Sequence, residues 1–248
     1  MVTDAEMESI MQFVKETEFT GYQRLELPNG YVIPGQDGRP LADLVFPERL
    51  DGKTVLDIGC YYGYFLQNAV DRGAARAVGV EHDPVRVGIA NRLAPLWDGR
   101  VEVRLADIET AVFDEKFDYV LMLKVLHHLS DPVGVMKKLA SLCRGTVIVE
   151  FREPWDPQFL YHARTGELEY RSAIGRLTAR LRSWAHRWLT DSIPLIGVGS
   201  TPYHRVWYPN RKAFHNLFVA HYPIFKEVQF KKSPGGRSEG MVAFCQCK

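Results

Sequence analysis

Residues 54–65, TVLDIGCYYGYF, contain the pattern that decides the fold. The run up to Ile58 is apolar and does not alternate, which is typical of a strand buried on both faces of a parallel sheet. It carries Asp57 near its end and is followed by Gly59 and Gly63, and an apolar pattern of helical spacing begins at Phe65. A strand, a tight turn with glycines and a helix are typical of the first unit of a nucleotide-binding α/β fold.

The turn has the form D-x-G-x-Y-x-G and differs from the G-x-G-x-x-G turn of dinucleotide-binding folds. Asp57 would repel a pyrophosphate, whereas a ligand with an ammonium and a sulfonium group fits beside a carboxylate. The turn resembles motif I, VLDxGxGxG, of class I S-adenosylmethionine (SAM)-dependent methyltransferases, with Tyr61 in the place of the middle glycine. The resemblance implies that Asp57, Gly59, Cys60, Tyr61 and Gly63 bind SAM. A strand-turn-helix that binds no ligand is the alternative that this stretch alone leaves open.

Acidic residues also stand at the ends of the next two expected strands. Glu81 can accept hydrogen bonds from both hydroxyls of a ribose, as acids at this position do in dinucleotide folds. The resemblance implies that Glu81 binds the SAM ribose, that Asp107 accepts from the adenine amino group, and that Ile108 gives a backbone contact. We expect His82 to lie against the adenine. Any one acid at a strand end is often a solvated loop residue, but three in register favour a SAM site.

The segment 117–132, FDYVLMLKVLHHLSDP, resembles the part of class I methyltransferases that runs beside the transferable methyl group. Lys124 is a candidate for contact with the cofactor or an acidic substrate group, or else a lysine that extends from a helix start into solvent. His127 and His128 are candidate general bases, because a neutral imidazole can accept a proton near neutral pH. The alternative for both is a structural hydrogen bond at a helix start. Glu150, at the end of a later strand, is a candidate substrate-binding acid.

Strands and helices alternate along the chain, which predicts a mostly parallel sheet with right-handed crossovers. We expect a Rossmann-like class I methyltransferase fold: a seven-stranded sheet with an antiparallel last strand, plus a helical cap insertion. The expected strands are 54–58, 77–81, 101–105, 117–123, 146–151, 225–232 and 240–247, and the expected helices are 3–19, 64–72, 83–93, 132–142, 174–189 and 211–220. The expected domains are an N-terminal helix and cofactor-closing segment (1–50), the SAM-binding core (51–151), a substrate cap (152–209), and a C-terminal helix and hairpin (210–248).

The expected cap is rich in aromatic, proline and arginine residues. Tyr203, His204 and Arg205 are candidates for binding a ring or an acidic group of the substrate, or they form the packed base of the cap. The arginine-rich helix 174–189 is either a solvated face or a surface for phosphate, membrane or nucleic acid.

Composition narrows the class of protein. Apolar residues make up 46% and charged residues 25% of the 248 residues, with a net charge of +1, so bulk charge does not indicate a polyanion-binding protein. The four cysteines and the histidines lack the spacing of a disulfide framework or a metal site, which favours buried thiols in a reducing cytoplasm. No apolar run approaches the length of about 18 residues that predicts a membrane span, and no secretory signal is visible. We therefore expect a cytoplasmic protein without a metal.

A narrower resemblance covers about 22–151. The order ELPNGYVIPG, then LDGKTVLDIGCYYGYF, is similar to proteins grouped with tRNA wobble-uridine carboxymethyl- or methyltransferases. That resemblance implies tRNA as substrate and carboxy-SAM as cofactor. However, LADLVFPERLDG stands where those enzymes carry a Trp- and Lys-rich segment, and the Asn/Asp-Pro-Pro-Tyr motif of many amino-methylating enzymes is absent. The sequence therefore favours SAM-dependent methylation of an oxygen, or next a nitrogen, of a small or glycosylated metabolite. The alternatives are a tRNA-modifying enzyme and a non-catalytic SAM-binding regulator.

Overall fold

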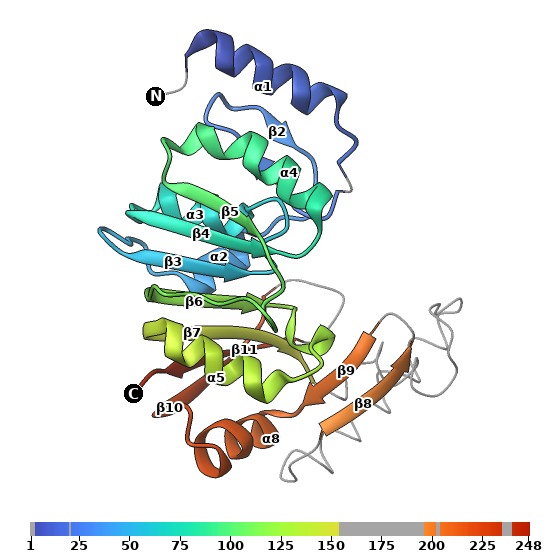
Figure 1. The fold of residues 1–248 in the computed structure, drawn as a ribbon, viewed down its shortest axis with the longest axis vertical. Helices are drawn as coiled ribbons and strands as arrows, with labels where there is room; N and C mark the ends of the chain where they lie inside the picture. The colour runs from blue at the N-terminus through green and yellow to red at the C-terminus, as the bar shows by residue number, and fades with distance from the viewer. Residues whose placement is uncertain (1–2, 20, 154–195, 202–203, 235–239) are drawn as a thin grey trace. The chain divides into compact units, whose positions relative to one another are not determined.

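The computed structural model describes residues 3–19, 21–153, 196–201, 204–234 and 240–248. The chain divides into two compact units, Met1–Leu121 and Met122–Lys248. Strand β6 (Phe117–Leu123) runs through the boundary between them, and the main sheet has the strand order β10-β11-β7-β6-β3-β4-β5. Figure 1 follows the chain through these elements.

The first unit contains three parallel strands, β3 (Thr54–Ile58), β4 (Arg76–Glu81) and β5 (Val101–Leu105). The apolar residues of β3 are buried, which confirms the prediction of a strand covered on both faces. Helix α3 (Tyr64–Asp71) follows β3, and α4 (Pro84–Leu93), continued by the 3₁₀ turn η1 (Ala94–Trp97), follows β4. Asp83 caps α4 by accepting from the backbone N–H groups of Val85 and Arg86 at 2.9 and 3.3 Å, as its sequence position before a proline predicts.

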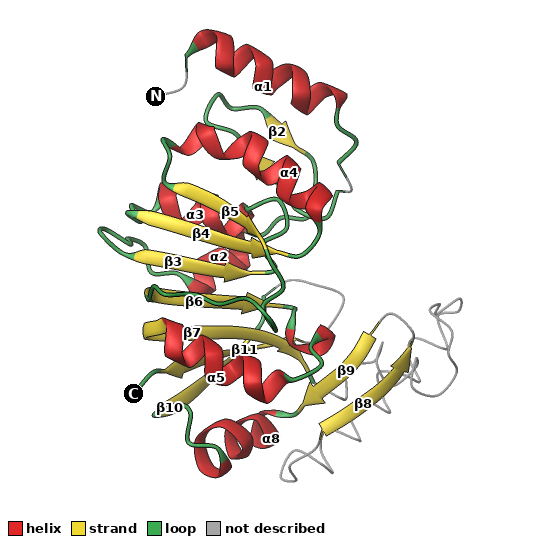
Figure 2. Ribbon diagram, viewed as in Figure 1, coloured by secondary structure: helices red, strands yellow, loops and turns green. Residues whose placement is uncertain are grey.

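The N-terminal part of this unit precedes the sheet. Helix α1 (Asp4–Glu16) begins with a capping box between Thr3 and Glu6. Strands β1 (Leu25–Glu26) and β2 (Val32–Ile33) form an antiparallel hairpin, and α2 (Arg39–Val45) is a helix that the sequence pattern does not predict. Figure 2 shows α1 lying above β2 and α4 within this unit, and Arg92 of α4 donates to Ser9 of α1 at 2.8 Å.

The second unit is built on β7 (Cys143–Arg152), β11 (Gly240–Gln246) and β10 (Glu227–Lys232). Strand β11 is antiparallel to both of its neighbours, so the predicted antiparallel last strand and the Rossmann-like fold class are confirmed. Helix α5 (Pro132–Leu142) follows the 3₁₀ turn η2 (Leu126–His128) and is capped by the side chain of Asp131. Helix α8 (Arg211–His215) is capped by the side chain of Asn210 and continues as a π-helix, η3 (Asn216–His221), where a single α-helix was expected.

The part of the expected helical cap, 152–209, that the structure describes contains strands, which the sequence analysis does not predict. Strands β8 (Ile196–Thr201) and β9 (His204–Pro209) pair as an antiparallel two-stranded sheet. The sequence here alternates Val206 and Tyr208 with other side chains, a pattern typical of strands that the neighbouring prolines obscure. The expected arginine-rich helix 174–189 lies outside the described residues.

None of the helices in the described ranges is both long enough and apolar enough to cross a membrane. The same ranges hold no group of three or more His, Cys, Asp or Glu side chains arranged for a metal ion. All four cysteines are free thiols, and Cys60, Cys143 and Cys245 are buried.

Candidate functional site

The turn after β3 has an unusual backbone. Gly59, Tyr61 and Gly63 all have positive φ angles, of +73°, +56° and +92°. Glycine adopts this left-handed region at little cost, but a residue with a Cβ is strained there. The backbone N–H of Gly59 donates to the Val80 carbonyl at 2.7 Å, which fixes the turn against β4. The turn therefore keeps a glycine-type conformation at Tyr61, where motif I has a glycine.

Close packing brings β4 against this turn. A Cβ at Gly79 would lie 2.5 Å from the Cys60 sulfur and 2.7 Å from a Leu66 methyl, so only glycine fits there. Cys60 itself is buried, and burial, with the charges of Asp57 and Glu81, raises the pKa of its thiol. Cys60 is therefore a packing residue held protonated rather than a nucleophile.

Asp57 is a buried acid at the end of β3. Its side chain is 2% exposed, and its Oδ2 atom has no hydrogen-bond partner among the described residues. Burial raises the pKa of this carboxyl well above its ordinary value, and the negative charge of Glu81 raises it further. A buried carboxyl with an unpartnered oxygen can receive a cationic group or a hydrogen-bond donor from a ligand.

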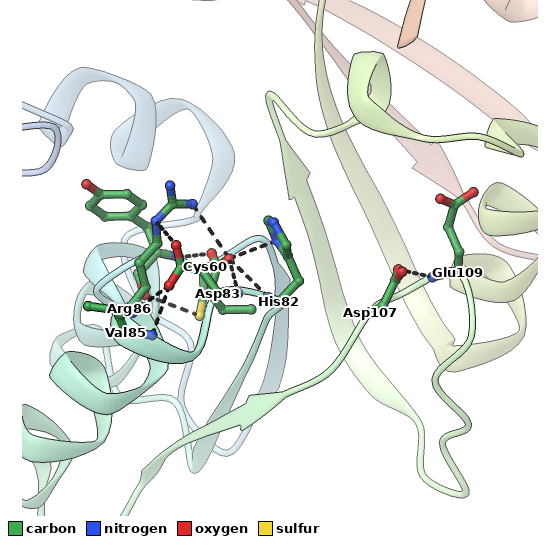
Figure 3. Close-up of polar contacts among 9 residues, drawn as sticks. Cys60, His82, Asp83, Val85, Arg86, Asp107 and Glu109 are labelled. Atoms are coloured by element: carbon green, nitrogen blue, oxygen red, sulfur yellow. Dashed lines mark hydrogen bonds and ion pairs between the residues drawn. The ribbon is translucent and has the colours of Figure 1, made fainter. Parts of the chain in front are cut away.

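Glu81, which ends β4, is 3% exposed, and its carboxylate accepts several hydrogen bonds. Its Oε2 accepts from the backbone N–H of Tyr61 at 3.1 Å, and its Oε1 accepts from the backbone N–H groups of His82 and Asp83 at 3.0 and 3.1 Å. The His82 ring and the Arg86 guanidinium also approach Oε1, at 3.0 and 3.7 Å. Figure 3 shows His82, Asp83 and Arg86 close together at the start of helix α4. The main chain therefore fixes the Glu81 carboxylate in place.

Asp107 and Ile108 follow β5 in a separate turn of the same unit. The Asp107 side chain accepts from the backbone N–H of Glu109 at 2.9 Å, and Ile108 is buried. In Figure 3, Asp107 and Glu109 lie apart from the Asp83 and Arg86 group. The side chain of His82 is 75% exposed, so its ring is open to solvent on this side of the turn.

In the second unit, Lys124 follows β6 in a left-handed conformation, with φ of +61°. Its backbone N–H donates to the Glu150 carbonyl at 3.1 Å. Strain of this kind at a residue other than glycine often marks a functional position. The Glu150 side chain is 3% exposed; its Oε1 accepts from the Ser233 hydroxyl at 2.6 Å, and its Oε2 has no partner among the described residues.

His127 and His128 lie on the turn η2, with their ring centres 4.0 Å apart. His127 is buried, and its ring stacks on Tyr208 of β9 with centroids 6.0 Å apart, whereas His128 is exposed. The backbones of His204 and Arg205 belong to β9, and Tyr203 lies outside the described residues.

Sequence reasoning missed two residues that contact the candidates, Arg86 and Ser233, and it did not predict that Tyr208 of the aromatic-rich cap segment stacks on His127. Arg86 has a sequence signal, because it stands one helical turn after the Asp83 cap and therefore at the same helix end as Glu81. The fold brings Tyr208 to His127 and Ser233 to Glu150, so no local sequence pattern predicts these two contacts.

Known proteins resemble this chain over much of its length. Residues 38–221 match the model of a family described as "Methyltransferase domain". A tRNA U34 carboxymethyltransferase of Campylobacter hominis is 40% identical over 95 residues, which cover 37% of this chain and 33% of that protein. A ubiquinone biosynthesis O-methyltransferase of Actinobacillus pleuropneumoniae is 26% identical over 161 residues, which cover 57% of this chain and 65% of that protein. The chain thus spans less than two thirds of the length of either relative.

Among solved structures, the N-terminal domain of EvdMO1, crystallised in the presence of S-adenosylhomocysteine (SAH) and D-fucose, has a similar fold. It is 16% identical, with a TM-score of 0.61, and the match covers 100% of this chain and 98% of that one. The predictions of a methyltransferase and of SAM as its cofactor are confirmed at the level of the family. The family model covers most of the chain, which therefore belongs to the methyltransferase domain family.

Proposed function

We propose that this protein transfers a methyl group from SAM to an oxygen, or next a nitrogen, of a small or glycosylated metabolite. The observation that carries the cofactor assignment is the pair of buried acids, Asp57 and Glu81, at the ends of two adjacent parallel strands beside a turn with three positive φ angles. Ligands of open α/β sheets bind at this edge of the strands.

The residues at this edge fit the chemistry of SAM. The unpartnered Oδ2 of Asp57 suits an ammonium or other donor of the cofactor. Among the described residues, Oε2 of Glu81 accepts from the Tyr61 backbone N–H, and a carboxylate oxygen has about two acceptor sites, so Oε2 can still accept from a ribose hydroxyl. We further propose that His82, Asp107 and Ile108 bind the adenine. None of these assignments requires a positively charged group beside the ligand, as an anionic pyrophosphate would.

The chemistry supplied by SAM is an electrophilic methyl on a sulfonium centre. The chain would bind and orient the cofactor and exclude water, which are large contributions to methyl transfer. We propose that an imidazole of His127 or His128 accepts the proton of the acceptor hydroxyl as the new O–CH₃ bond forms. His127, buried against Tyr208, is held in one orientation, while the exposed His128 can meet an incoming acceptor from solvent. We propose Lys124, Glu150, Tyr203, His204 and Arg205 as further acceptor contacts, with Lys124 also a candidate for the cofactor.

Two relatives support a small acceptor. The Actinobacillus protein is named for O-methylation in ubiquinone biosynthesis, and the EvdMO1 domain was crystallised with D-fucose, a sugar. The second candidate, tRNA, is favoured by the 40% identity to the Campylobacter tRNA enzyme, although that match covers only a third of its length.

The experiment is calorimetry with SAM, SAH and carboxy-SAM, followed by assays of SAH release with acceptor panels. We expect micromolar binding of SAM and SAH, and turnover with a hydroxylated ring or a sugar. Turnover with tRNA alone, with an affinity that falls steeply as salt rises, would select the tRNA function. Tight SAM binding without turnover on any panel would favour a regulator, and absence of SAM binding would contradict the proposed cofactor.

A further inference from the structure

The segment that precedes the family match contacts the glycine turn directly. The family model begins at residue 38, but the side chain of Gln23 reaches the turn and its Oε1 accepts from the backbone N–H of Tyr62 at 3.3 Å. A second contact ties the same segment to the start of α3, where the Gln67 side-chain amide donates to the Glu26 carbonyl. The hairpin segment and the turn are therefore joined by hydrogen bonds, although Gln23 and Tyr62 are 39 residues apart in the sequence.

Aromatic contacts join the same two parts. The ring of Tyr22 lies 4.9 Å from the ring of Tyr61, and the ring of Phe19 meets Tyr62 edge-on at 5.5 Å. On another side of Tyr61, the Arg86 guanidinium lies 4.8 Å from the ring centre. The Tyr61 ring is thus held between the N-terminal segment and helix α4.

These contacts surround the strained residue of the turn. Tyr61 has a φ of +56° without being a glycine, and such a conformation persists only when its surroundings enforce it. Its own backbone N–H is held by Glu81, and the next N–H along the chain, that of Tyr62, is held by Gln23. Two consecutive amides are therefore fixed by two side chains from distant parts of the sequence.

We propose that Gln23 is a positioning residue for cofactor binding: by holding the Tyr62 amide, it keeps Tyr61 in the left-handed conformation that a glycine would adopt unaided. The inference rests on the proposed function in one respect, that SAM binds at this turn. It explains how the chain can carry tyrosine where motif I has glycine, and it gives the hairpin segment a role in cofactor affinity. Without Gln23, a smaller fraction of the protein has the competent turn, and the apparent affinity falls by that fraction.

A purely structural role for Gln23 would have a different signature. If Gln23 only stabilised the fold, its loss would lower the melting temperature and leave the affinity of the folded protein for SAH unchanged. If it acts on Tyr61, its effect on affinity must depend on which residue stands at position 61. A double-mutant cycle between the two positions separates these roles.

The experiment measures SAH affinity by calorimetry, and melting temperature, in full-length variants. Gln23→Leu removes the acceptor at similar size, and we expect SAH binding to weaken about five- to tenfold, as for loss of one partly buried hydrogen bond. Gln23→Glu keeps an acceptor oxygen and should bind within about twofold of wild type. In a Tyr61→Gly background, the same Gln23→Leu change should weaken binding by less than about twofold. Gln36→Leu is the matched control, since Gln36 is exposed in the same segment.

The outcomes of these measurements test the positioning role of Gln23 as follows. Wild-type affinity in a folded Gln23→Leu variant would overturn the positioning role while leaving SAM binding intact. Equal weakening by Gln23→Leu in the wild-type and Tyr61→Gly backgrounds would also overturn it. If Gln23→Leu fails to fold, the Gln23→Glu variant tests the role instead. It must retain the SAH affinity of wild type, and a loss of affinity in it would overturn the positioning role. Absence of SAH and SAM binding in the wild type would overturn the proposed function, and this inference with it.

Discussion

Glu81 and Glu150 are two equally buried carboxylates, each 3% exposed and each at or near the end of a strand, yet their surroundings differ. Glu81 accepts three backbone hydrogen bonds from residues of its own unit, and two side chains of basic character approach it. Glu150 accepts from the Ser233 hydroxyl, and its other oxygen has no partner among the described residues.

The difference separates two kinds of site. Donors near in the sequence, His82 and Asp83, and the turn amide of Tyr61 fix Glu81 before any ligand arrives, so this region is preorganised. Glu150 depends on Ser233, which is far along the chain, and has acceptor capacity left for a donor that a ligand brings. We therefore expect changes at Glu81 to affect the cofactor and changes at Glu150 to affect the acceptor.

The largest effect should come from Glu81→Ala. This change removes the proposed ribose acceptor and leaves the Tyr61 amide without its carboxylate, so we expect SAH affinity to fall by about 100-fold or more. Glu150→Ala should leave SAH affinity within about twofold. Calorimetry on both variants makes the test, with the exposed Glu48→Ala as control. Equal losses in the Glu81 and Glu150 variants would show that the two carboxylates do not serve separate ligands.

The next effect concerns Asp57 and pH. In the free protein, burial raises the pKa of this carboxyl above 3.8, and a cationic cofactor should lower it again. Binding should therefore release a proton in the pH range between the lowered and the raised pKa, and affinity should rise with pH across that range. In the protein without ligand, the contribution of Asp57 to folding stability changes with pH in the opposite direction. Because the pKa of Asp57 is raised in the folded state, this contribution is present below pH 3.8 and is lost as pH rises through the raised pKa.

Calorimetry in two buffers of different ionisation enthalpy measures the proton released by wild type. Asp57→Asn should weaken SAH binding about tenfold and abolish the proton release. Unchanged proton release in this variant would mean that another group titrates on binding.

Most of the fold, and less of the site, could be predicted from the sequence. Strands 54–58, 101–105 and 117–123 have the expected bounds, because buried runs and their turn residues are local signals. The caps Asp83 and Asp131 are local signals of the same kind, because each stands directly before a proline that begins a helix. The strands β8 and β9 were missed, since prolines and an arginine-rich neighbour hid a short alternating pattern.

The partners of the candidate residues were harder to predict than the candidates themselves. Glu81 and Glu150 were found because acids at strand ends stand out in a sequence. Two of their donors, Tyr61 and Ser233, could not be predicted, because they meet these carboxylates across the fold, 20 and 83 residues away. Side-chain hydrogen bonds of this kind depend on tertiary packing, which no local period encodes.

A smaller effect, on stability, should follow from Ser233→Ala. This change leaves Glu150 Oε1 buried without its donor, which should cost about 1–2 kcal/mol of unfolding free energy. Replacing both partners, with Glu150→Met and Ser233→Ala together, should cost less than the sum of the single changes. Urea unfolding measures these values, and additive costs would indicate that the two side chains do not interact. SAH affinity should be unaffected in all three variants.

The smallest effect should come from Arg86→Met, which tests whether charge or main chain holds Glu81. The Arg86 side chain is 37% exposed and its guanidinium lies 3.7 Å from Glu81, a geometry whose charge attraction is weak and screened by salt. We therefore expect SAH affinity to fall only about two- to threefold, and the difference from wild type to shrink at high salt. Calorimetry at low and high salt measures both. A loss as large as that of Glu81→Ala would mean that the ion pair, and not the three amides, positions this carboxylate, and the contrast with Glu150 would then be one of charge rather than of preorganisation.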